Sequence, residues 1–344
     1  MGKHSKKSNK GLEILGILLI IVLIIFISVA GYGWWYLNHK LSALNYLEIA
    51  EDKIEVNEGV NLEKKGYRNI AIFGVDSRAN TYDDTRSDCI IIAAINEETN
   101  DVKLVSVYRD SYLNINGYGL DKVTHAFSYG GAELAINTLN KNLDLDIKEF
   151  VALNFGAVVD IINEVGGVEI TITSEELKYI NSYISEIDKI ESKSTKRITY
   201  AGKQTLNGVQ ALAYSRIRYT SGGDYKRTER MRDVLTATAN KAKKLSITEL
   251  NRILDKLLPE VSTNIKANEI RALIPEAMKF NINTSVGWPY NVQGITLDRW
   301  YGVPVTLETN VKKLHQEVYG ESEYEPSGKV KEISNSIIKK TGYR

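Results

Sequence analysis

Asn-Ile-Ala-Ile-Phe-Gly-Val, residues 69–75, is the stretch that decides the fold class. Two similar runs follow it: Cys-Ile-Ile-Ile-Ala-Ala-Ile at 89–95 and Val-Lys-Leu-Val-Ser-Val at 102–107. All three runs are short and rich in β-branched residues, a composition typical of strands buried in a sheet. They predict the centre of a β-sheet.

Helical patterns follow the third run and alternate with two further strand patterns. We expect strands at 150–154 and 168–172, and helices at 133–143, 157–165, 206–213, 228–245, 247–258 and 268–280. Alternation of strands and helices is typical of an α/β fold in which helices cover both faces of a sheet.

Residues 14–37, near the N-terminus, contain no charged side chain. A helix needs about 20 apolar residues to cross a bilayer, so this segment predicts one transmembrane helix. Residues 1–13 carry four lysines and one glutamate, which predicts a basic cytoplasmic tail and an extracellular position for the rest of the chain. A cleaved signal peptide is the alternative, because Ser-Val-Ala at 28–30 resembles a cleavage site.

The extracellular part divides into three segments by composition. Residues 38–66 are polar and helix-compatible, which predicts a stalk or linker. Residues 67–320 hold the strand and helix patterns and predict one folded domain, and residues 321–344 predict a C-terminal tail.

Overall charge and cysteine content exclude several classes of function. Lys and Arg total 44 against 43 Asp and Glu, a net charge of +1, whereas nucleic-acid-binding proteins usually have a strong basic excess. We therefore expect no nucleic-acid partner. The single cysteine, Cys89, cannot form an internal disulfide, and with only four histidines in the chain a metal would be held by oxygen ligands.

Acidic residues flank the expected strands, where ligands bind in open α/β sheets. Asp76 follows the first strand, Asp88 precedes the second, and Arg109-Asp110 follows the third. Carboxylates without imidazole or thiolate favour Mg²⁺, with Mn²⁺ possible, so Asp76 and Asp88 are the candidate metal ligands. Alternatively, both aspartates are turn or helix-capping residues.

A basic cluster occupies residues 216–233 and surrounds a Gly-Gly loop. Arg216 and Arg218 end one expected helix, while Arg227 and Arg230 begin the next on one face. The planar arginine fork suits bidentate binding of phosphate oxygens, and a helix N-terminus adds amide donors. The competing interpretation is a solvated, salt-bridged helix face.

Together these segments resemble the LytR-CpsA-Psr (LCP) family over roughly residues 66 to 320. The motifs that carry the resemblance occur in order: Asp76-Ser77-Arg78, Arg86-Ser87-Asp88, Tyr108-Arg109-Asp110, residues 122–131, Gly166-Gly167-Val168, residues 214–218 and residues 223–230.

The resemblance implies an α-β-α sandwich with a central mixed sheet and an apolar tunnel for a lipid chain. It also implies a phosphotransferase in a Gram-positive-type envelope. Such an enzyme moves a glycopolymer (teichoic acid, capsule or another wall polysaccharide) from a polyprenyl-pyrophosphate carrier to peptidoglycan and releases polyprenyl phosphate.

Family positions map onto individual residues of this chain. Asp76 and Asp88 match the magnesium-associated aspartates, and Arg109 is predicted to be catalytic together with them. The general base remains open among Asp76, Asp88 and Asp110. The predicted pyrophosphate-binding residues are Arg86, Arg109, Lys122, Arg216, Arg218, Arg227 and Arg230.

This sequence departs from the family pattern at three positions. Tyr108 stands where proline is frequent, Cys89 where threonine is common, and Met231 where glutamine is common. Methionine cannot donate a hydrogen bond to phosphate, so a contact expected at position 231 is missing here.

Other functions remain open on the sequence. A pyrophosphatase would need the same head-group site, and so would a non-enzymatic protein that senses lipid pyrophosphate. A serine hydrolase would use Ser128 in Ala-Phe-Ser-Tyr-Gly with His315 as its histidine. His125 is expected to support the site rather than to act as a catalyst.

Overall fold

The computed structural model describes residues 45–75, 85–246, 249–250, 252–253, 260–266, 269–270 and 276–344. Asp76, the predicted tail at 1–13, the predicted transmembrane helix at 14–37 and most of the helices predicted at 247–258 and 268–280 lie outside these ranges. Among the described residues, no helix is long and apolar enough to cross a membrane.

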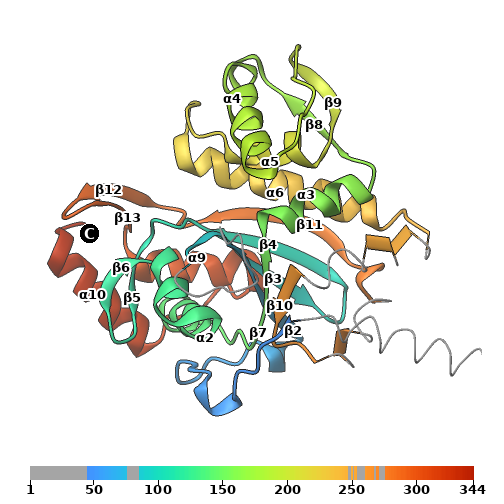
Figure 1. Ribbon diagram of the computed structural model, residues 1–344. Helices are drawn as coiled ribbons and strands as arrows, with labels where there is room; N and C mark the ends of the chain where they lie inside the picture. The colour runs from blue at the N-terminus through green and yellow to red at the C-terminus, as the bar shows by residue number, and fades with distance from the viewer. Residues whose placement is uncertain are drawn as a thin grey trace, which may run out of the picture. The chain divides into compact units, whose positions relative to one another are not determined.

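A seven-stranded mixed sheet forms the centre of the fold (Figure 1). The pairs β1–β10, β7–β2 and β4–β11 are parallel, and the other neighbours are antiparallel. The three runs predicted first form β2, β3 and β4, adjacent strands in the sheet. In spatial order the strands are β1 (Asn45–Tyr46), β10 (Val261–Thr263), β7 (Glu149–Asn154), β2 (Tyr67–Val75), β3 (Ser87–Asn96), β4 (Asp101–Val107) and β11 (Asn281–Trp288).

One face of the sheet is covered by α2 (Thr124–Leu143), α9 (Leu307–Tyr319) and α10 (Gly328–Thr341). Phe73, Ile92 and Val105 point to this side and share one buried core with these helices. The hairpin of β5 (Tyr112–Ile115) and β6 (Gly119–Lys122) packs into the same core, and β12 (Val292–Thr296) pairs with β13 (Trp300–Pro304) nearby. Alternate residues of the strands therefore form one continuous apolar face.

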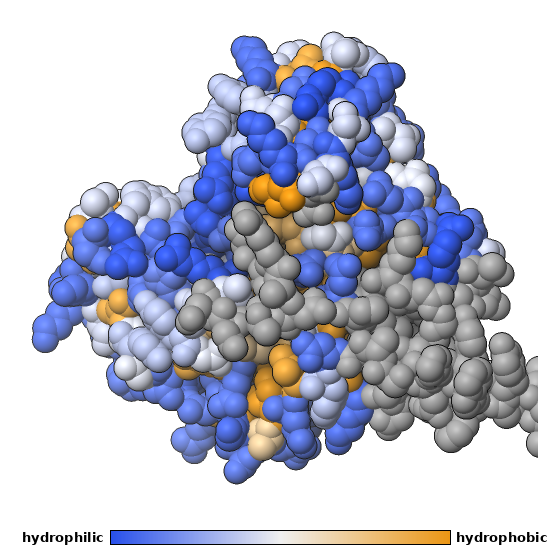
Figure 2. Space-filling model, in the orientation of Figure 1, coloured by the Kyte–Doolittle hydropathy of each residue, from blue (hydrophilic) through white to orange (hydrophobic). Residues whose placement is uncertain are grey.

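The opposite face of the sheet meets a second layer of helices. This layer contains α3 (Phe155–Glu164), α4 (Ser174–Glu191), α5 (Gly208–Arg216) and α6 (Gly223–Ala242), with a core of its own. Ile91 and Leu104 on the sheet pack with Leu235 of α6. Figure 2 shows a mostly hydrophilic surface, with apolar side chains gathered where this layer meets the sheet. The expected mixed sheet between two helical layers is confirmed.

Local sequence signals set several helix boundaries. Thr173 and Glu176 form a capping box at the start of α4, and Asn207 and Gln210 form one at the start of α5. In each box the first side chain accepts a backbone N–H and the second accepts one in return, which satisfies donors left open by the first turn.

The structure differs from three predictions about the organisation of the chain. The predicted strand at 168–172 forms as β8 (Val168–Ile172), but it pairs with β9 (Gly202–Leu206) outside the central sheet. The described part of the predicted stalk contains two 3-10 turns, η1 (Glu51–Lys53) and η2 (Glu63–Lys65), and buries Leu62 in the main core.

The third difference is in the predicted C-terminal tail at 321–344, which contains the helix α10. Its Val330, Ile333 and Ile337 are buried in the main core. These apolar residues recur at helical spacing, which places them on the one face that α10 presents to the core.

Candidate functional site

The candidate site lies where three central strands bring their polar ends together. β3 runs antiparallel to β2 and β4, so the start of β3 adjoins the ends of both neighbours. Asp88 therefore lies at the same edge as Arg109 and Asp110, which follow β4. Lys122 ends β6, and the second helical layer adds Arg218, Asp224 and Arg227.

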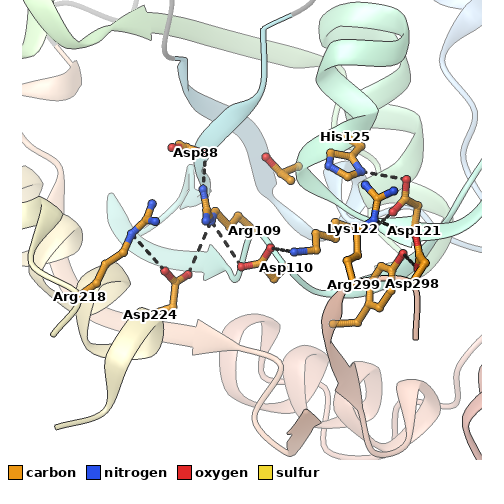
Figure 3. A network of polar contacts seen from close by, with 12 residues as sticks. Asp88, Arg109, Asp110, Asp121, Lys122, His125, Arg218, Asp224, Asp298 and Arg299 are labelled. Carbon is orange, nitrogen blue, oxygen red and sulfur yellow. Dashed lines mark hydrogen bonds and ion pairs between the residues drawn. The ribbon is translucent and has the colours of Figure 1, made fainter. Parts of the chain in front are cut away.

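Arg109 is the centre of the polar network (Figure 3). Its Nη1 donates a hydrogen bond of 2.7 Å to Oδ1 of Asp88. Its Nε lies 3.4 Å from Oδ2 of Asp110 and 3.9 Å from Oδ2 of Asp224. Burial alone would lower the pKa of Arg109, but the carboxylates of Asp88 and Asp110 outweigh burial and raise it. The guanidinium thus joins three acidic residues from separate segments.

Three further cations surround the network. Lys122 Nζ lies 2.7 Å from Oδ1 of Asp110, and Arg227 Nη2 donates to Asp224 Oδ2 at 3.1 Å. Arg218 Nε is 3.7 Å from Asp224 Oδ1, and its side chain is 42% exposed. That separation is too long for a hydrogen bond, so Arg218 has donors available for an incoming anion.

Arg227 is a buried cation with donor capacity to spare. Its side chain is 2% exposed, and within the described part of the chain its Nε has no hydrogen-bond partner. Burial lowers the pKa of Arg227, although an arginine stays charged in any ordinary environment. A buried donor without a partner costs free energy, which a bound anionic oxygen would recover.

An apolar cavity of about 160 Å³ adjoins the network. It lies between β2, β3 and β7 of the sheet and helices α3, α5 and α6. Cys89, directly after Asp88, is in its wall; burial raises the pKa of this thiol to about 11, and the charge of Arg227 partly opposes that rise. The lining residues are Ile72, Phe73, Gly74, Cys89, Ile91, Leu153, Phe155, Val158, Ile161, Ile162, Leu212, Ser215, Met231, Val234, Leu235 and Thr238.

Two of the predicted arginines lie away from the network. Arg216 donates to Glu186 at 3.0 Å and stacks its guanidinium over Phe155. Arg230 is buried, and its three donor groups bond to Glu176, to the backbone oxygen of Ile217 and to Thr220. These contacts give Arg230 a structural role, because each nitrogen of its buried guanidinium already has a partner within the protein.

The remaining predicted residues are placed as follows. The structure brings Asp88, Arg109, Lys122, Arg218 and Arg227 together, whereas Arg86 lies exposed directly before β3 and Asp76 is outside the described residues.

Sequence reasoning missed the role of Asp224, which contacts three arginines of the network. Asp224 precedes Arg227 by three residues on α6, a spacing at which an acidic and a basic side chain can pair, and this spacing could have identified it from the sequence.

The oxygen-rich part of the site fits a hard divalent cation that is shared with a substrate. Among the described residues, no group of three His, Cys, Asp or Glu side chains could hold a metal alone. Mg²⁺ is commonly bound by one or two carboxylates together with substrate phosphates and water. Asp88 offers such a carboxylate beside cations that suit a phosphate.

The serine hydrolase alternative is wrong. Ser128 Oγ donates to the backbone oxygen of His125 at 3.0 Å. His315 is buried, with its Nδ1 2.9 Å from Glu321 and its Nε2 3.1 Å from the backbone oxygen of Leu143. The hydroxyl and the imidazole required for a triad are therefore not hydrogen-bonded to each other.

Comparison with known proteins places the chain in a family. The model of the LytR_cpsA_psr family matches residues 32–316, most of the chain. The chain belongs to the LytR-CpsA-Psr family. This LCP protein is 30% identical over 85% of its length to Bacillus subtilis (strain 168) TagT, named polyisoprenyl-teichoic acid–peptidoglycan teichoic acid transferase, and covers 90% of that relative.

Two further matches agree with this assignment. Enterococcus faecalis TagU, which carries the same transferase name, is 30% identical over 77% of the LCP chain and 83% of the relative. The solved structure of TagT bound to LI-WTA has a TM-score of 0.63 at 25% identity, and the match covers 80% of this chain and 99% of that one.

Proposed function

We propose that this LCP protein is a phosphotransferase that attaches a teichoic-acid-type glycopolymer to peptidoglycan. The donor is the polymer on a polyprenyl-pyrophosphate carrier, and polyprenyl phosphate is released. The observation that carries the proposal is the position of the cationic network next to an apolar cavity. A ligand with an anionic head and a long apolar tail is complementary to both parts.

Each part of the proposed donor is complementary to a different part of the site. The prenyl chain enters the cavity between the sheet and α3, α5 and α6, where burial of apolar surface favours it. The pyrophosphate lies against Arg109, Arg218 and Arg227. Their contacts to Asp88 and Asp224 keep the cations in position before the substrate binds.

The reaction is an in-line displacement at phosphorus. The acceptor hydroxyl oxygen bonds to the phosphorus that carries the glycopolymer, and the bond from that phosphorus to the oxygen of polyprenyl phosphate breaks. The hydroxyl proton passes to a carboxylate, for which Asp110 is the described candidate, because a carboxylate that binds a metal, as proposed for Asp88, is a poor base. Mg²⁺ bound by Asp88, with Asp76 as a further ligand, would neutralise charge on the phosphates.

The proposed location of the enzyme follows from the same substrate. We place residues 14–37 across the cytoplasmic membrane, with residues 1–13 inside and the catalytic domain outside. A membrane anchor keeps the cavity close to the bilayer that holds the prenyl chain, and peptidoglycan lies on the same side as the catalytic domain.

The test is turnover of a defined polyprenyl-pyrophosphate oligosaccharide by the full-length protein in detergent. Products are followed by mass spectrometry with and without a peptidoglycan acceptor and with and without Mg²⁺. Acceptor-dependent joining of sugar to glycan with release of polyprenyl phosphate supports the proposal. Release without an acceptor would favour a pyrophosphatase, and binding without release would favour a sensor.

Arginine variants test the assignment of the site in this assay. Replacing Arg218 or Arg227 by alanine should lower turnover about 100-fold, because each substitution removes a positioned cationic donor that binds the pyrophosphate. Arg197→Ala is the control and should stay near wild type, since its guanidinium bonds to Asp188 and Ser185 on α4. Equal activity in all three variants would contradict the site.

A further inference from the structure

Two tyrosines form an exposed stacked pair beside the cationic network. Tyr118 lies in the turn between β5 and β6, and Tyr129 lies near the start of α2. Their rings are 4.3 Å apart with an interplanar angle of 16°, and the residues are 55% and 40% exposed. Exposed aromatic rings grouped on a surface often mark a binding site. We call this pair the tyrosine platform.

Hydrogen bonds fix the orientation of the tyrosine platform. The Tyr129 hydroxyl donates to Oδ2 of Asp121 at 2.8 Å, and Nδ1 of the buried His125 lies 2.8 Å from the same oxygen. Directly after Tyr129 the helix is interrupted, and Gly131 has φ of +62°, a conformation that favours glycine. The Tyr129 ring is therefore held in place before any ligand arrives, and the Tyr118 ring stacks on it.

The tyrosine platform is continuous with the cationic network. Asp121, which holds Tyr129, directly precedes Lys122, whose ammonium pairs with Asp110 (Figure 3). Hydrogen bonding to Asp121 raises the pKa of the Tyr129 phenol, and the charges of Arg299 and Arg86 oppose that rise.

The two binding features lie on opposite faces of the sheet. The cavity proposed for the prenyl chain is on the side of α3, α5 and α6, whereas α2 and the β5–β6 hairpin pack on the other side. In an in-line displacement the attacking oxygen approaches phosphorus opposite the leaving group. Since the leaving polyprenyl phosphate points toward the cavity, the acceptor hydroxyl approaches from the side away from the cavity, and the elements that carry the tyrosine platform pack on that side of the sheet.

We propose that the tyrosine platform is the acceptor subsite and stacks against a pyranose ring of the peptidoglycan glycan strand. The inference rests on the proposed transferase function and names the residues that bind its second substrate. The C–H groups on one face of a pyranose carry partial positive charge and suit the negative face of an aromatic ring. The Tyr129 hydroxyl donates to Asp121, and its oxygen can accept a hydrogen bond from a sugar hydroxyl.

Steady-state kinetics with a varied acceptor test this role. With a soluble peptidoglycan glycan oligomer as acceptor, Tyr118→Leu and Tyr129→Leu should raise the KM for the acceptor about tenfold. The KM for the polyprenyl-pyrophosphate donor should stay within about twofold. Tyr118→Phe keeps the ring and should retain the wild-type acceptor KM. Tyr200→Leu is the control, because Tyr200 is 58% exposed in the separate α3–α6 layer.

Three outcomes would overturn the proposal. They are an unchanged acceptor KM in both leucine variants, an equal rise in the Tyr200→Leu control, and a rise in the donor KM alone. The last result would assign the rings to a sugar of the donor. Circular dichroism of each variant shows whether a kinetic change follows from misfolding.

Direct binding separates this inference from the proposed function. Saturation-transfer NMR is recorded for a tetrasaccharide of alternating N-acetylglucosamine and N-acetylmuramic acid with the full-length protein. Binding that is lost in Tyr118→Leu and kept in Tyr200→Leu supports the subsite even if no transfer is seen. Transfer by wild type with no effect of either leucine variant on this binding rejects the subsite and leaves the proposed function standing.

Discussion

At the scale of single residues, Arg227 and Arg230 show how identical side chains on one helix acquire different roles. They are three positions apart on α6 and both are buried. Arg230 has a carboxylate, a carbonyl and a hydroxyl as partners, whereas Arg227 shares Asp224 with Arg109 and Arg218. Only the residues brought by α4 and by the loop before α6 decide which arginine is free to bind an anion.

Removing the Arg230 side chain should destabilise the fold. Arg230→Ala leaves Glu176 buried without its cation, and breaking a buried ion pair in this way costs about 3–5 kcal/mol. The free energy of unfolding from urea titration measures this loss, with the more exposed Arg218→Ala as control. A stability equal to that of the control would contradict the structural role of Arg230.

The three departures from the family pattern have local explanations. Cys89 and Met231 both line the apolar cavity, where neither needs a hydrogen bond. Tyr108 packs against Tyr225 in a tilted arrangement, with ring centroids 4.6 Å apart and an interplanar angle of 54°. Met231 therefore contributes apolar surface at the position where a phosphate contact was expected.

At the scale of elements, strands were more predictable than helix boundaries. The runs that form β2, β3 and β4 are apolar on both faces, so their composition alone identifies them. α2 begins at Thr124, nine residues before the predicted start at Glu133, because the glycines at 130 and 131 conceal the first part of the helix. α10 was missed as part of the core, although Val330, Ile333 and Ile337 recur at helical spacing and were the available signal.

Truncation of one α10 side chain should measure how much this helix stabilises the domain. Ile337 is 1% exposed, and Ile337→Ala should lower the free energy of unfolding by about 2–5 kcal/mol through lost burial and a residual cavity. Asn335 is exposed on the same helix, so Asn335→Ala should change stability by less than about 0.5 kcal/mol. Equal urea midpoints for both variants would show that α10 is not part of the cooperative core.

At the scale of the whole molecule, the stability of both helical layers depends on pH through one carboxylate in each, the buried Glu176 and the partly buried Glu321. Burial alone would raise the pKa of Glu176, but hydrogen bonds from Thr173 and Arg230 outweigh it and hold the pKa below 4.5. In Glu321, contacts to Lys65 and His315 likewise overcome burial and lower the pKa. One carboxylate lies in each layer, so acid weakens both.

Stability should therefore fall on the acid side. The folded pKa of Glu176 is lower than the unfolded value, so its contribution is complete above about pH 4.5 and is lost as the pH falls toward the folded pKa. Urea titrations at about pH 7, 5 and 3 measure the change. Glu176→Gln should reduce the dependence of the free energy of unfolding on pH between the two lower pH values. An unchanged dependence would show that other groups cause the loss of stability in acid.

The sequence by itself determined the class of fold, the family and most of the charged residues of the site. Apolar runs specify buried strands wherever they lie, and a planar arginine fork suits phosphate in any fold. Tertiary structure decided which of those charges act together. Asp88, Arg109, Lys122 and Arg218 come from separate segments that only the sheet order and the docking of α6 bring to one edge. The burial of each charged side chain and the identity of its partner depend on these long-range contacts, which the local sequence does not encode.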